Sequence, residues 1–589
     1  MNFTRFSDLN YDKFPYISVS AYEKDCWNGW NSVISYLNRY SFALNKKKLV
    51  VVAEFYTGVS DVVFDYLKHN FYNDYCFSAA DVMKTQEEID KLIYPDVTDD
   101  ELFGFMTQLE MNDFFDEKKL LAMKAAIGNI KSGIVLVMGC GASLIADADL
   151  LLYFDMPRWE AQLRFRRNEA GNLGADNKEE RASLQYKRAY FVDWRVCDRL
   201  KKKLMKRWDF VFDTVDNDMP KMVSANLYFA ALEKAVHQPF RVVPFFDPGP
   251  WGGQWMKEVC DLDKDVDNYA WCFDCVPEEN SLLLKVGEVL FETPSVNLVF
   301  WAPQALLGKE VFMKFGDEFP IRFDFLDTMQ GGNLSLQVHP LKQYIKQKFG
   351  MQYTQDESYY ILDAGDDACV YLGLKEGVNP EEMIDALKLS QKTACFDAEL
   401  YVEKWQARRH DHFLIPAGTV HCSGANTMVL EISATPYIFT FKLWDWNRLG
   451  LDGRPRPINI DHGKQVIQWD RTTQWTKNNL INQITLVGEG DNWTEEKTGL
   501  HELEFIESRR HWFSAKVNHY NNAGVNVLNL VEGSEAIVES PDNMFEPFIV
   551  HYAETFIIPA TIKKYSIRPH GTSEGKLCAT IKTYVRLDT

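Results

Sequence analysis

The pattern of apolar residues changes near Phe240, and this change constrains the fold more than any other feature of the sequence. Before it, apolar runs alternate with segments of helical spacing. The clearest runs are Leu49–Glu54, Ile134–Met138 and Leu150–Phe154. Strands that alternate with helices predict a parallel sheet with crossover helices. The first part of the chain is therefore predicted to be an α/β domain.

After Phe240, Pro and Gly become frequent and short strand-like runs replace helices. Asn379–Leu389 is the exception, because a Pro at the first turn and helical spacing predict a helix there. From about Gln468 to Thr589, Gly and Pro interrupt a β pattern about every eight to twelve residues, which indicates a sandwich or barrel. We therefore expect β-barrels to follow the α/β domain.

The charge balance limits the classes of partner. The chain has 64 Lys and Arg against 84 Asp and Glu, a formal charge of −20. This charge argues against a nucleic-acid partner, which needs a basic surface, but a small anionic substrate needs only one or two local cations. No apolar run approaches the roughly 20 residues of a membrane helix, and the N-terminal residues lack a signal-peptide pattern. We expect a cytoplasmic protein without a membrane partner.

The cysteines give no metal site of their own. The eleven cysteines include one closely spaced pair, Cys272 and Cys275, and no second pair follows. A four-thiolate zinc site is therefore not predicted. Scattered single cysteines are typical of reduced, mostly buried thiols in the cytosol.

Four other residues have the chemistry and spacing of a metal site. Gln337 and His339 are two residues apart, which places both side chains on one face of a strand. Glu357 precedes another strand and His421 lies in a strand–turn–strand segment. A barrel interior can bring these segments together, and two imidazoles, a carboxylate and an amide oxygen suit zinc, with manganese, iron or cobalt left open. By spacing alone the signal is weak, because a histidine in such a position is more often a hydrogen-bonded core or surface residue, and Gln337 is more often a solvated strand residue.

Several motifs between Phe245 and Arg448 occur in the order found in one family. They are Trp251-Gly252-Gly253, Leu334-Ser335-Leu336-Gln337-Val338-His339-Pro340, Glu357 ahead of Tyr359-Tyr360-Ile361-Leu362, Pro416-Ala417-Gly418-Thr419-Val420-His421, the acidic Glu431, and Trp444-Asp445-Trp446-Asn447-Arg448. This segment resembles the class I mannose-6-phosphate isomerases. The resemblance implies a cupin-type, jelly-roll barrel with one divalent metal, zinc, held by Gln337, His339, Glu357 and His421. It also implies interconversion of mannose 6-phosphate and fructose 6-phosphate through a cis-enediol.

The resemblance further suggests catalytic residues. Glu431, Lys442 and Arg448 are the predicted set, with Glu431 either an acid/base or a carboxylate that orients a ligand or an arginine. Lys442 stands where the family has an arginine that faces the reacting carbons, and Gln355 stands where it has a lysine. The nearby basic segment Arg408–His410 could compensate. These departures motivate an alternative function, a non-catalytic or altered-specificity sugar-phosphate-binding regulatory protein that retains the metal site.

The N-terminal part matches a phosphate-binding pattern only in part. Val50–Ser60 follows the P-loop spacing, but Ala53 replaces the first glycine and Val59 replaces the lysine. The later strand that ends at Asp155 and the basic helix with Arg164, Arg166 and Arg167 resemble a uridine-kinase-like fold. We interpret this part as a kinase-like domain that has lost phosphoryl transfer, because the phosphates lose their main point charge. A plain α/β domain with an exposed basic helix, a bifunctional isomerase–kinase, and roles in docking, oligomerisation or nucleotide sensing stay open.

A chain of 589 residues is too long for one core, and we predict three domains. Residues 1–235 form a degenerate P-loop kinase-like α/β domain, residues 236–465 a catalytic metal-binding cupin domain, and residues 466–589 a C-terminal cupin-like barrel without metal. The two barrels share an apolar strand that ends in a Pro turn, at Phe413 and at Phe556. The histidines of the last barrel, His501, His511, His519, His551 and His570, form no ligand pattern. The sequence leaves the oligomeric state unknown.

Overall fold

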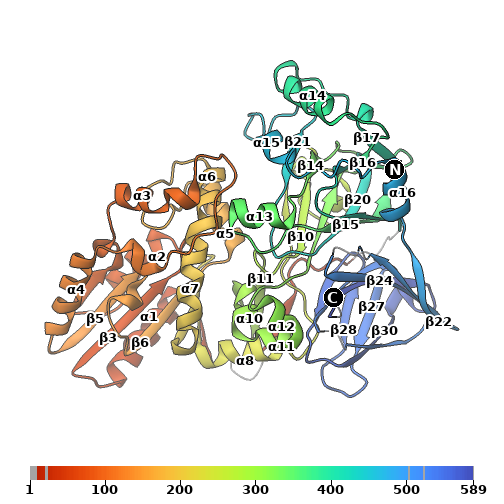
Figure 1. The fold of residues 1–589 in the computed structure, drawn as a ribbon. Coiled ribbons are helices and arrows are strands. Elements are labelled where there is room, and N and C mark those ends of the chain that lie inside the picture. The colour runs from red at the N-terminus through yellow and green to blue at the C-terminus, as the bar shows by residue number, and fades with distance from the viewer. Residues whose placement is uncertain (1–9, 20–23, 500, 502–503, 522–523, 588–589) are drawn as a thin grey trace.

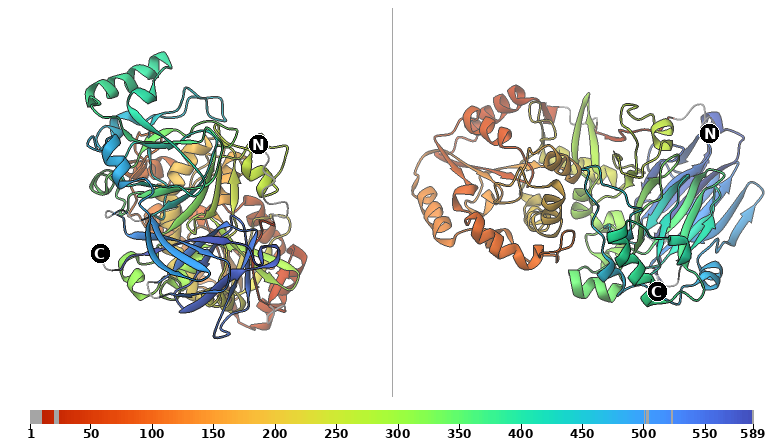
Figure 2. Two further views of the ribbon diagram at one scale, coloured as in Figure 1. Left: turned by 90° about the vertical axis from the view of Figure 1, so that its right-hand side faces the viewer. Right: turned by 90° about the horizontal axis from the view of Figure 1, so that it is seen from above.

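The computed structural model of the chain describes residues 10–19, 24–499, 501, 504–521 and 524–587. An α/β body lies on one side of the molecule and two β-barrels lie on the other, one above the other in Figure 1. The view from above in Figure 2 shows the α/β body beside the stacked barrels. No helix among the described residues is long and apolar enough to cross a membrane.

The α/β body is built on a mixed sheet with the strand order β2-β8-β7-β6-β3-β5-β4. Its strands are β2 (Cys26–Asn28), β3 (Lys48–Phe55), β4 (Tyr75–Ser78), β5 (Gly133–Gly139), β6 (Leu150–Asp155), β7 (Phe210–Asp213) and β8 (Lys221–Ser224). The five strands from β4 to β7 along the sheet are parallel, and β8 and β2 continue the sheet antiparallel. The apolar runs in β3, β5 and β6 confirm the predicted parallel sheet. They are buried because helices cover both faces.

Helices flank this sheet, and several of them begin at polar side-chain caps. They are α1 (Trp30–Ala43), α2 (Asp61–Asn70), α3 (Gln86–Val97), α4 (Glu117–Asn129), α5 (Arg158–Arg166), α6 (Ala182–Arg188), α7 (Trp194–Leu204) and α8 (Ala225–Ala235), with a π-helical turn, η5 (Ala189–Asp193), between α6 and α7. Ser60 caps α2 by accepting the N–H of Val62, and Thr85 and Glu88 form a capping box on α3. These side chains satisfy backbone N–H groups that a helix start leaves unpaired.

The helix predicted to be an exposed basic segment is partly buried. Arg164 of α5 is 1% exposed and donates hydrogen bonds to the carbonyls of Gly58 and Thr214, at 2.9 and 2.7 Å. Arg166 pairs with Asp247 of β9 at 2.7 Å. The arginines of α5 therefore fasten neighbouring segments to the body, which the sequence pattern alone does not reveal.

The first barrel consists of two facing sheets. The six-stranded sheet has the order β18-β15-β20-β13-β10-β9, and the five-stranded sheet has the order β17-β16-β19-β14-β21. Their strands are β9 (Phe245–Asp247), β10 (Trp271–Cys275), β13 (Arg322–Asp327), β14 (Leu336–Val338), β15 (Glu357–Ala364), β16 (Cys369–Leu374), β17 (Val402–Gln406), β18 (His412–Ile415), β19 (His421–Ser423), β20 (Thr427–Ser433) and β21 (Phe441–Trp444). All of their pairings are antiparallel. The apolar core lies between the two sheets.

The expectation that a single helix interrupts this β region is wrong. The predicted helix is present as α14 (Pro380–Thr393), capped by Asn379. The other helices are α9 (Trp255–Val259), α10 (Val296–Trp301), α11 (Pro303–Leu307), α12 (Lys309–Phe315), α13 (Lys342–Phe349), α15 (Ile460–Gly463) and α16 (Thr473–Asn479). They are short and rich in aromatic and β-branched residues, so their apolar content resembles that of strands.

The second barrel also has two sheets, with the orders β22-β23-β24-β31-β26-β29 and β25-β30-β27-β28. Its strands are β22 (Thr485–Gly490), β23 (Trp493–Gly499), β24 (Ile506–Phe513), β25 (Val517–Tyr520), β26 (Asn526–Glu532), β27 (Glu535–Glu539), β28 (Phe548–His551), β29 (Thr555–Ile558), β30 (Lys564–Pro569) and β31 (Cys578–Val585). The two strands that end in Pro turns, β18 and β29, each form the edge of a six-stranded sheet. The shared plan read from the sequence is therefore present in the fold.

Residues far apart in sequence join these bodies. A three-stranded sheet links β1 (Tyr16–Ser18), β11 (Ser281–Val286) and β12 (Val289–Pro294), with β1 parallel to β11. Arg241 is 2% exposed and pairs with Asp274 of β10 and with Glu554 of the second barrel, at 3.4 and 2.8 Å. The residue limits of the three domains stay a prediction.

Candidate metal centre

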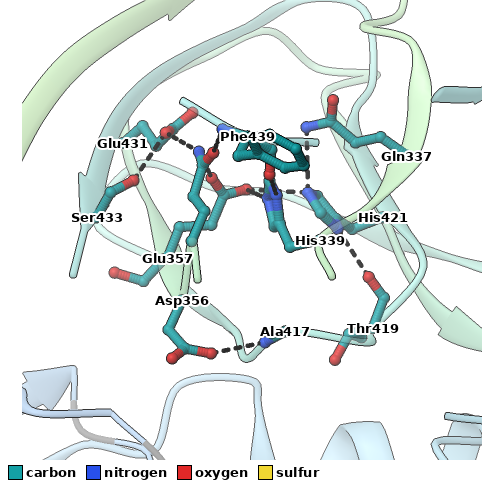
Figure 3. A network of polar contacts seen from close by, with 12 residues as sticks. Gln337, His339, Asp356, Glu357, Ala417, Thr419, His421, Glu431, Ser433 and Phe439 are labelled. Carbon is teal, nitrogen blue, oxygen red and sulfur yellow. Dashed lines mark hydrogen bonds and ion pairs between the residues drawn. The ribbon is translucent and has the colours of Figure 1, made fainter. Parts of the chain in front are cut away.

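The four predicted ligands come from three neighbouring strands of the first barrel. Gln337 lies in β14 and His339 directly follows that strand, while Glu357 begins β15 and His421 begins β19. The antiparallel pairing places Gln337 opposite His421. Glu357 comes from the facing sheet, so its carboxylate reaches across the barrel interior to both imidazoles (Figure 3). The structure thus brings the four side chains together.

The distances within this group are short. Oε1 of Glu357 lies 3.1 Å from Nε2 of His339 and 2.9 Å from Nε2 of His421. The ligand atoms of these three residues all lie within 4.8 Å of one another. The side-chain nitrogen of Gln337 lies 3.2 Å from Nε2 of His421. A half-turn of the Gln337 amide group about its last side-chain bond would exchange its nitrogen and oxygen, so that the oxygen faces His421 and Glu357.

Backbone carbonyls orient both imidazoles. Nδ1 of His339 lies 3.0 Å from the carbonyl oxygen of Phe439, and Nδ1 of His421 lies 2.8 Å from that of Thr419. A carbonyl accepts a hydrogen bond, so each Nδ1 carries the proton and each Nε2 is left with a lone pair. Carbonyl partners of this kind typically fix metal-binding histidines. Both lone pairs face Glu357.

A divalent metal fits the bonding of this group. The three residues are almost completely buried, at 0–1% exposed. Apart from their mutual approach, Nε2 of His339 and Oε1 of Glu357 have no hydrogen-bond partner among the described residues. Buried polar atoms are costly unless something satisfies them, and a cation between the three ligand atoms would do so. The mixture of nitrogen and oxygen donors suits zinc.

The electrostatics favour a charged Glu357 and a neutral His421. Burial alone would raise the pKa of Glu357, but His339 and His421 outweigh burial and hold that pKa well below its usual range. Burial lowers the pKa of His421, against the pull of Glu357. Neutral imidazoles and a carboxylate are the protonation states that bind a metal.

Glu431 lies beside the centre within a second polar network. Its Oε1 accepts hydrogen bonds from Arg322 at 2.6 Å, Ser433 at 2.9 Å and Gln355 at 3.1 Å. Burial, Asp324 and Glu357 raise the pKa of Glu431 well above its usual range, although Arg322 opposes them. Glu431 therefore contacts an arginine, and burial favours its neutral form. Which of its two predicted roles it has stays a prediction.

Arg322 and Asp324 are neighbours of this site that the motif comparison missed. Both lie in β13, are 1–2% exposed and pair with each other at 2.9 Å. Their spacing of two residues places them on one face of the strand, and that spacing was the available signal. The guanidinium of Arg322 bonds to Glu431, which Gln355 also contacts, so an arginine takes part in this network although Gln355 stands at the family's lysine position.

The other two predicted catalytic residues lie at β21. Lys442 pairs with Gln337 across the sheet. Burial, with Arg456, lowers the pKa of Lys442 to about 7. Arg448 donates to Asp445 at 2.8 Å and to the carbonyl of Asn333 at 2.5 Å, so it braces a turn.

Arg408–His410 do not compensate at the metal group. Arg409 pairs with Glu532 of β26 at 2.7 Å, and His410 lies 2.7 Å from the hydroxyl of Tyr360 and 3.2 Å from Glu532. These two side chains therefore join the two barrels. The basic segment serves the interface because the loop that carries it turns toward the second barrel.

The α/β body covers the metal end of the barrel with a loop, residues 98–107. Phe103 of this loop is 7% exposed, and its ring centroid lies 4.8 Å from Phe439, 5.3 Å from Phe441 and 5.4 Å from Phe349. Met106 donates its N–H to the carbonyl of Phe349 at 2.9 Å. The loop therefore packs on the residue whose carbonyl orients His339.

Comparison with known proteins finds relatives over part of the chain. The chain is 28% identical over 153 residues to the mannose-6-phosphate isomerase ManA of Bacillus subtilis (strain 168), which is 26% of this chain and 45% of that protein. It is 25% identical over 219 residues to the mannose-6-phosphate isomerase of Streptococcus mutans serotype c (strain ATCC 700610 / UA159), which is 37% of this chain and 64% of that protein. Part of the chain is homologous to mannose-6-phosphate isomerases. The chain spans less than two thirds of the length of either relative.

Solved structures and one family complete the comparison. The crystal structure of the mannose 6-phosphate isomerase from Bacillus subtilis matches 59% of this chain and 99% of its own, at 17% identity and a TM-score of 0.48. A mannose 6-phosphate isomerase bound with zinc and yttrium matches the same shares at 13% identity and a TM-score of 0.45. Residues 29–237 match a family described as a domain of unknown function (DUF8485). The kinase-like interpretation of the α/β body stays a prediction.

Proposed function

We propose that the chain is a zinc-dependent aldose–ketose isomerase that interconverts mannose 6-phosphate and fructose 6-phosphate through a cis-enediol. The observation that carries the proposal is the buried group of His339, Glu357 and His421. Within it, Nε2 of His339 and Oε1 of Glu357 have no hydrogen-bond partner outside the group among the described residues. Homology of part of the chain to mannose-6-phosphate isomerases supports the substrate. Gln337 would complete the ligand set through its amide oxygen.

The reaction moves a proton between C2 of the aldose and C1 of the ketose, and a hydroxyl proton shifts in the same sense. Bound zinc would supply a Lewis acid for the negative charge that develops on the sugar oxygens. Lys442 lies across the sheet from Gln337, and its pKa of about 7 suits a group that accepts and returns a proton. The raised pKa of Glu431 favours its protonated form, which would donate a proton to a sugar oxygen. Arg448 would hold the turn that follows Lys442.

A metal-loaded activity assay tests this function. Purified protein with zinc is supplied with mannose 6-phosphate, and fructose 6-phosphate is detected by a coupled enzyme. We expect turnover by the natural chain and by Glu87→Gln, an exposed control, and no turnover by Glu357→Gln. Zinc bound one to one without formation of fructose 6-phosphate would overturn the proposal.

A non-catalytic, sugar-phosphate-binding regulatory protein is the second candidate. The observation that favours it is the mutual engagement of Glu431, Gln355 and Arg322, which leaves these groups bonded to one another rather than free for a substrate. This candidate predicts binding of mannose 6-phosphate by calorimetry without turnover. Measured turnover would exclude it.

For the α/β body we propose a degenerate P-loop, kinase-like domain without phosphoryl transfer. The five parallel strands and the strand–loop–helix from β3 through Ser60 into α2 support this proposal. Val59 stands at the lysine position, and its N–H already bonds to the carbonyl of Tyr56 at 3.3 Å. We expect no heat when ATP and magnesium are titrated into the full chain. A saturable signal for ATP binding would contradict the proposed degeneration of the P-loop and would favour a bifunctional isomerase–kinase.

A further inference from the structure

A crevice with a volume of about 530 Å³ lies where three parts of the chain meet. Its walls come from α12, α13, the segment 352–356 that leads into β15, and residues 504, 505 and 586 of the second barrel. Four basic side chains line it, Lys314, Lys342, Lys346 and Arg586. A space of this size accommodates a small organic ligand.

The lysines of the crevice are exposed and have no close ion-pair partner in the described part of the chain. Among the described residues, Lys314, Lys342 and Lys346 have no carboxylate oxygen within the 4.0 Å of an ion pair. The chain as a whole carries a charge of −20, so carboxylates were available in excess. Cations that face one space repel one another, and an anion in that space would remove the repulsion.

A buried acid completes the polar lining. Glu504 is 3% exposed, and its Oε1 has no hydrogen-bond partner among the described residues. Burial raises the pKa of Glu504 well above its usual range, with Asp356 contributing. A protonated carboxyl can donate to an oxygen of an anionic ligand. The raised pKa of Glu504 therefore favours a neutral carboxyl group, which would not repel an anion in the crevice.

Aromatic rings form the apolar wall. Phe315 lies 4.8 Å from Phe505 and 5.6 Å from Tyr353, measured between ring centroids. Nζ of Lys314 lies 5.5 Å from the centroid of Phe315 and 5.7 Å from that of Phe505. Rings beside cations suit a ligand with a charged end and a less polar body, such as a phosphorylated sugar.

The crevice and the metal group lie on opposite sides of one segment. Gln355 and Glu357 point into the barrel, where Gln355 donates to Glu357 at 2.7 Å. Asp356, between them, points away toward Ala417 in Figure 3 and accepts its N–H at 2.8 Å. Because Asp356 and Thr354 line the crevice, its ligand would lie behind the metal ligands rather than among them.

We propose that this crevice binds a phosphate monoester, at a site separate from the metal centre. The proposal does not depend on isomerase activity, because it rests on residues outside the metal group. The ligand's phosphate would contact Lys342 and Lys346 of α13 and Lys314 of α12, and its body would lie against the rings.

Calorimetric titration of the full chain tests the proposal with three probes: inorganic phosphate, mannose 6-phosphate and unphosphorylated mannose. The titrations are repeated with Lys342→Gln/Lys346→Gln and with the control Lys118→Gln/Lys124→Gln, which removes the same charge from exposed positions of α4. We expect the phosphorylated sugar to bind, mannose not to bind, and the dissociation constant to rise about tenfold or more only in the α13 variant. Tighter binding of the sugar phosphate than of inorganic phosphate would identify an esterified ligand.

The metal-site variant Glu357→Gln separates the crevice from the metal centre. We expect it to keep the binding of mannose 6-phosphate that Lys342→Gln/Lys346→Gln weakens, whether or not the natural chain also binds this sugar at the metal centre. Loss of binding in Glu357→Gln with retention in Lys342→Gln/Lys346→Gln would overturn the proposal, and so would equal binding of phosphorylated and unphosphorylated sugar. Circular dichroism of each variant establishes that it is folded.

Discussion

Phe103 connects the α/β body to the metal centre, so its removal should weaken zinc binding without touching a ligand. The ring packs on Phe439, whose carbonyl oxygen orients His339, and on Phe441, which precedes Lys442. Truncating a buried Phe to Ala usually costs about 3–5 kcal/mol, because a cavity replaces the ring. With the ring removed, the backbone of Phe439 should become more mobile, and its carbonyl should hold His339 less firmly.

Loss of a direct partner of a metal-binding histidine typically lowers metal affinity about 10–100-fold. Phe103 acts one residue further away, so we expect Phe103→Ala to lower zinc affinity by about tenfold, the lower end of that range. Competition with a chromophoric chelator measures this affinity directly and requires no assumption about substrate.

The matched control is Phe42→Ala. Phe42 belongs to the same body but is 58% exposed. We expect its zinc affinity to equal that of the natural chain. If Phe103→Ala is folded and binds zinc as tightly as Phe42→Ala does, the loop does not position His339, and the reasoning is refuted.

Three further predictions follow from buried charges. Chelation of the metal should lower the melting temperature of the natural chain but not that of His421→Ala, which has already lost a ligand; an equal decrease in both would show that the stabilising ion binds elsewhere. Burial lowers the pKa of His412 to about 3, so the unfolded chain binds more protons between about pH 3 and 6.5, and stability should fall on acidification below pH 6.5 by about 1.4 kcal/mol per pH unit. Urea unfolding at several pH values should show a shallower pH dependence in His412→Gln, and an unchanged slope would contradict the assignment. Arg241→Met should destabilise the chain by about 3–5 kcal/mol, because Asp274 and Glu554 lose their buried partner. The control Lys91→Met removes one member of an exposed pair and should change the free energy of unfolding little. Equal denaturant midpoints for the two variants would be inconsistent with a buried ion network.

The sequence predicts those parts of the fold in which local pattern and burial coincide. The continuous apolar runs of β3, β5 and β6 could only be strands buried on both faces. The cap and Pro of α14 likewise determine a helix from adjacent residues. Helices α10 to α12 were not predicted, because they are short and their apolar residues pack against several elements at once.

The residues of the candidate site were likewise predictable only where a local pattern marks them. Ordered motifs identify Gln337, His339, Glu357 and His421 because each ligand belongs to a recognisable local pattern. The pairing of Arg322 with Glu431 joins residues 109 apart, and no local pattern records it. Phe103 is further still from its partners, and an isolated aromatic in a loop resembles any surface residue until the two bodies are placed together.

The pairing of β1 with β11 also affects how the chain is made. β11 leaves the ribosome about 265 residues after β1, and the amide of Asp12, which bonds to Glu554 at 2.6 Å, finds its partner only 542 residues later. Contacts so distant in sequence form slowly, because a long loop must close before they stabilise anything. Until β11 is made, β1 has no partner strand, and unpaired strand edges of this kind invite pairing with another chain. Synthesis of this protein should therefore depend on chaperones that cover such an edge until the last barrel has folded.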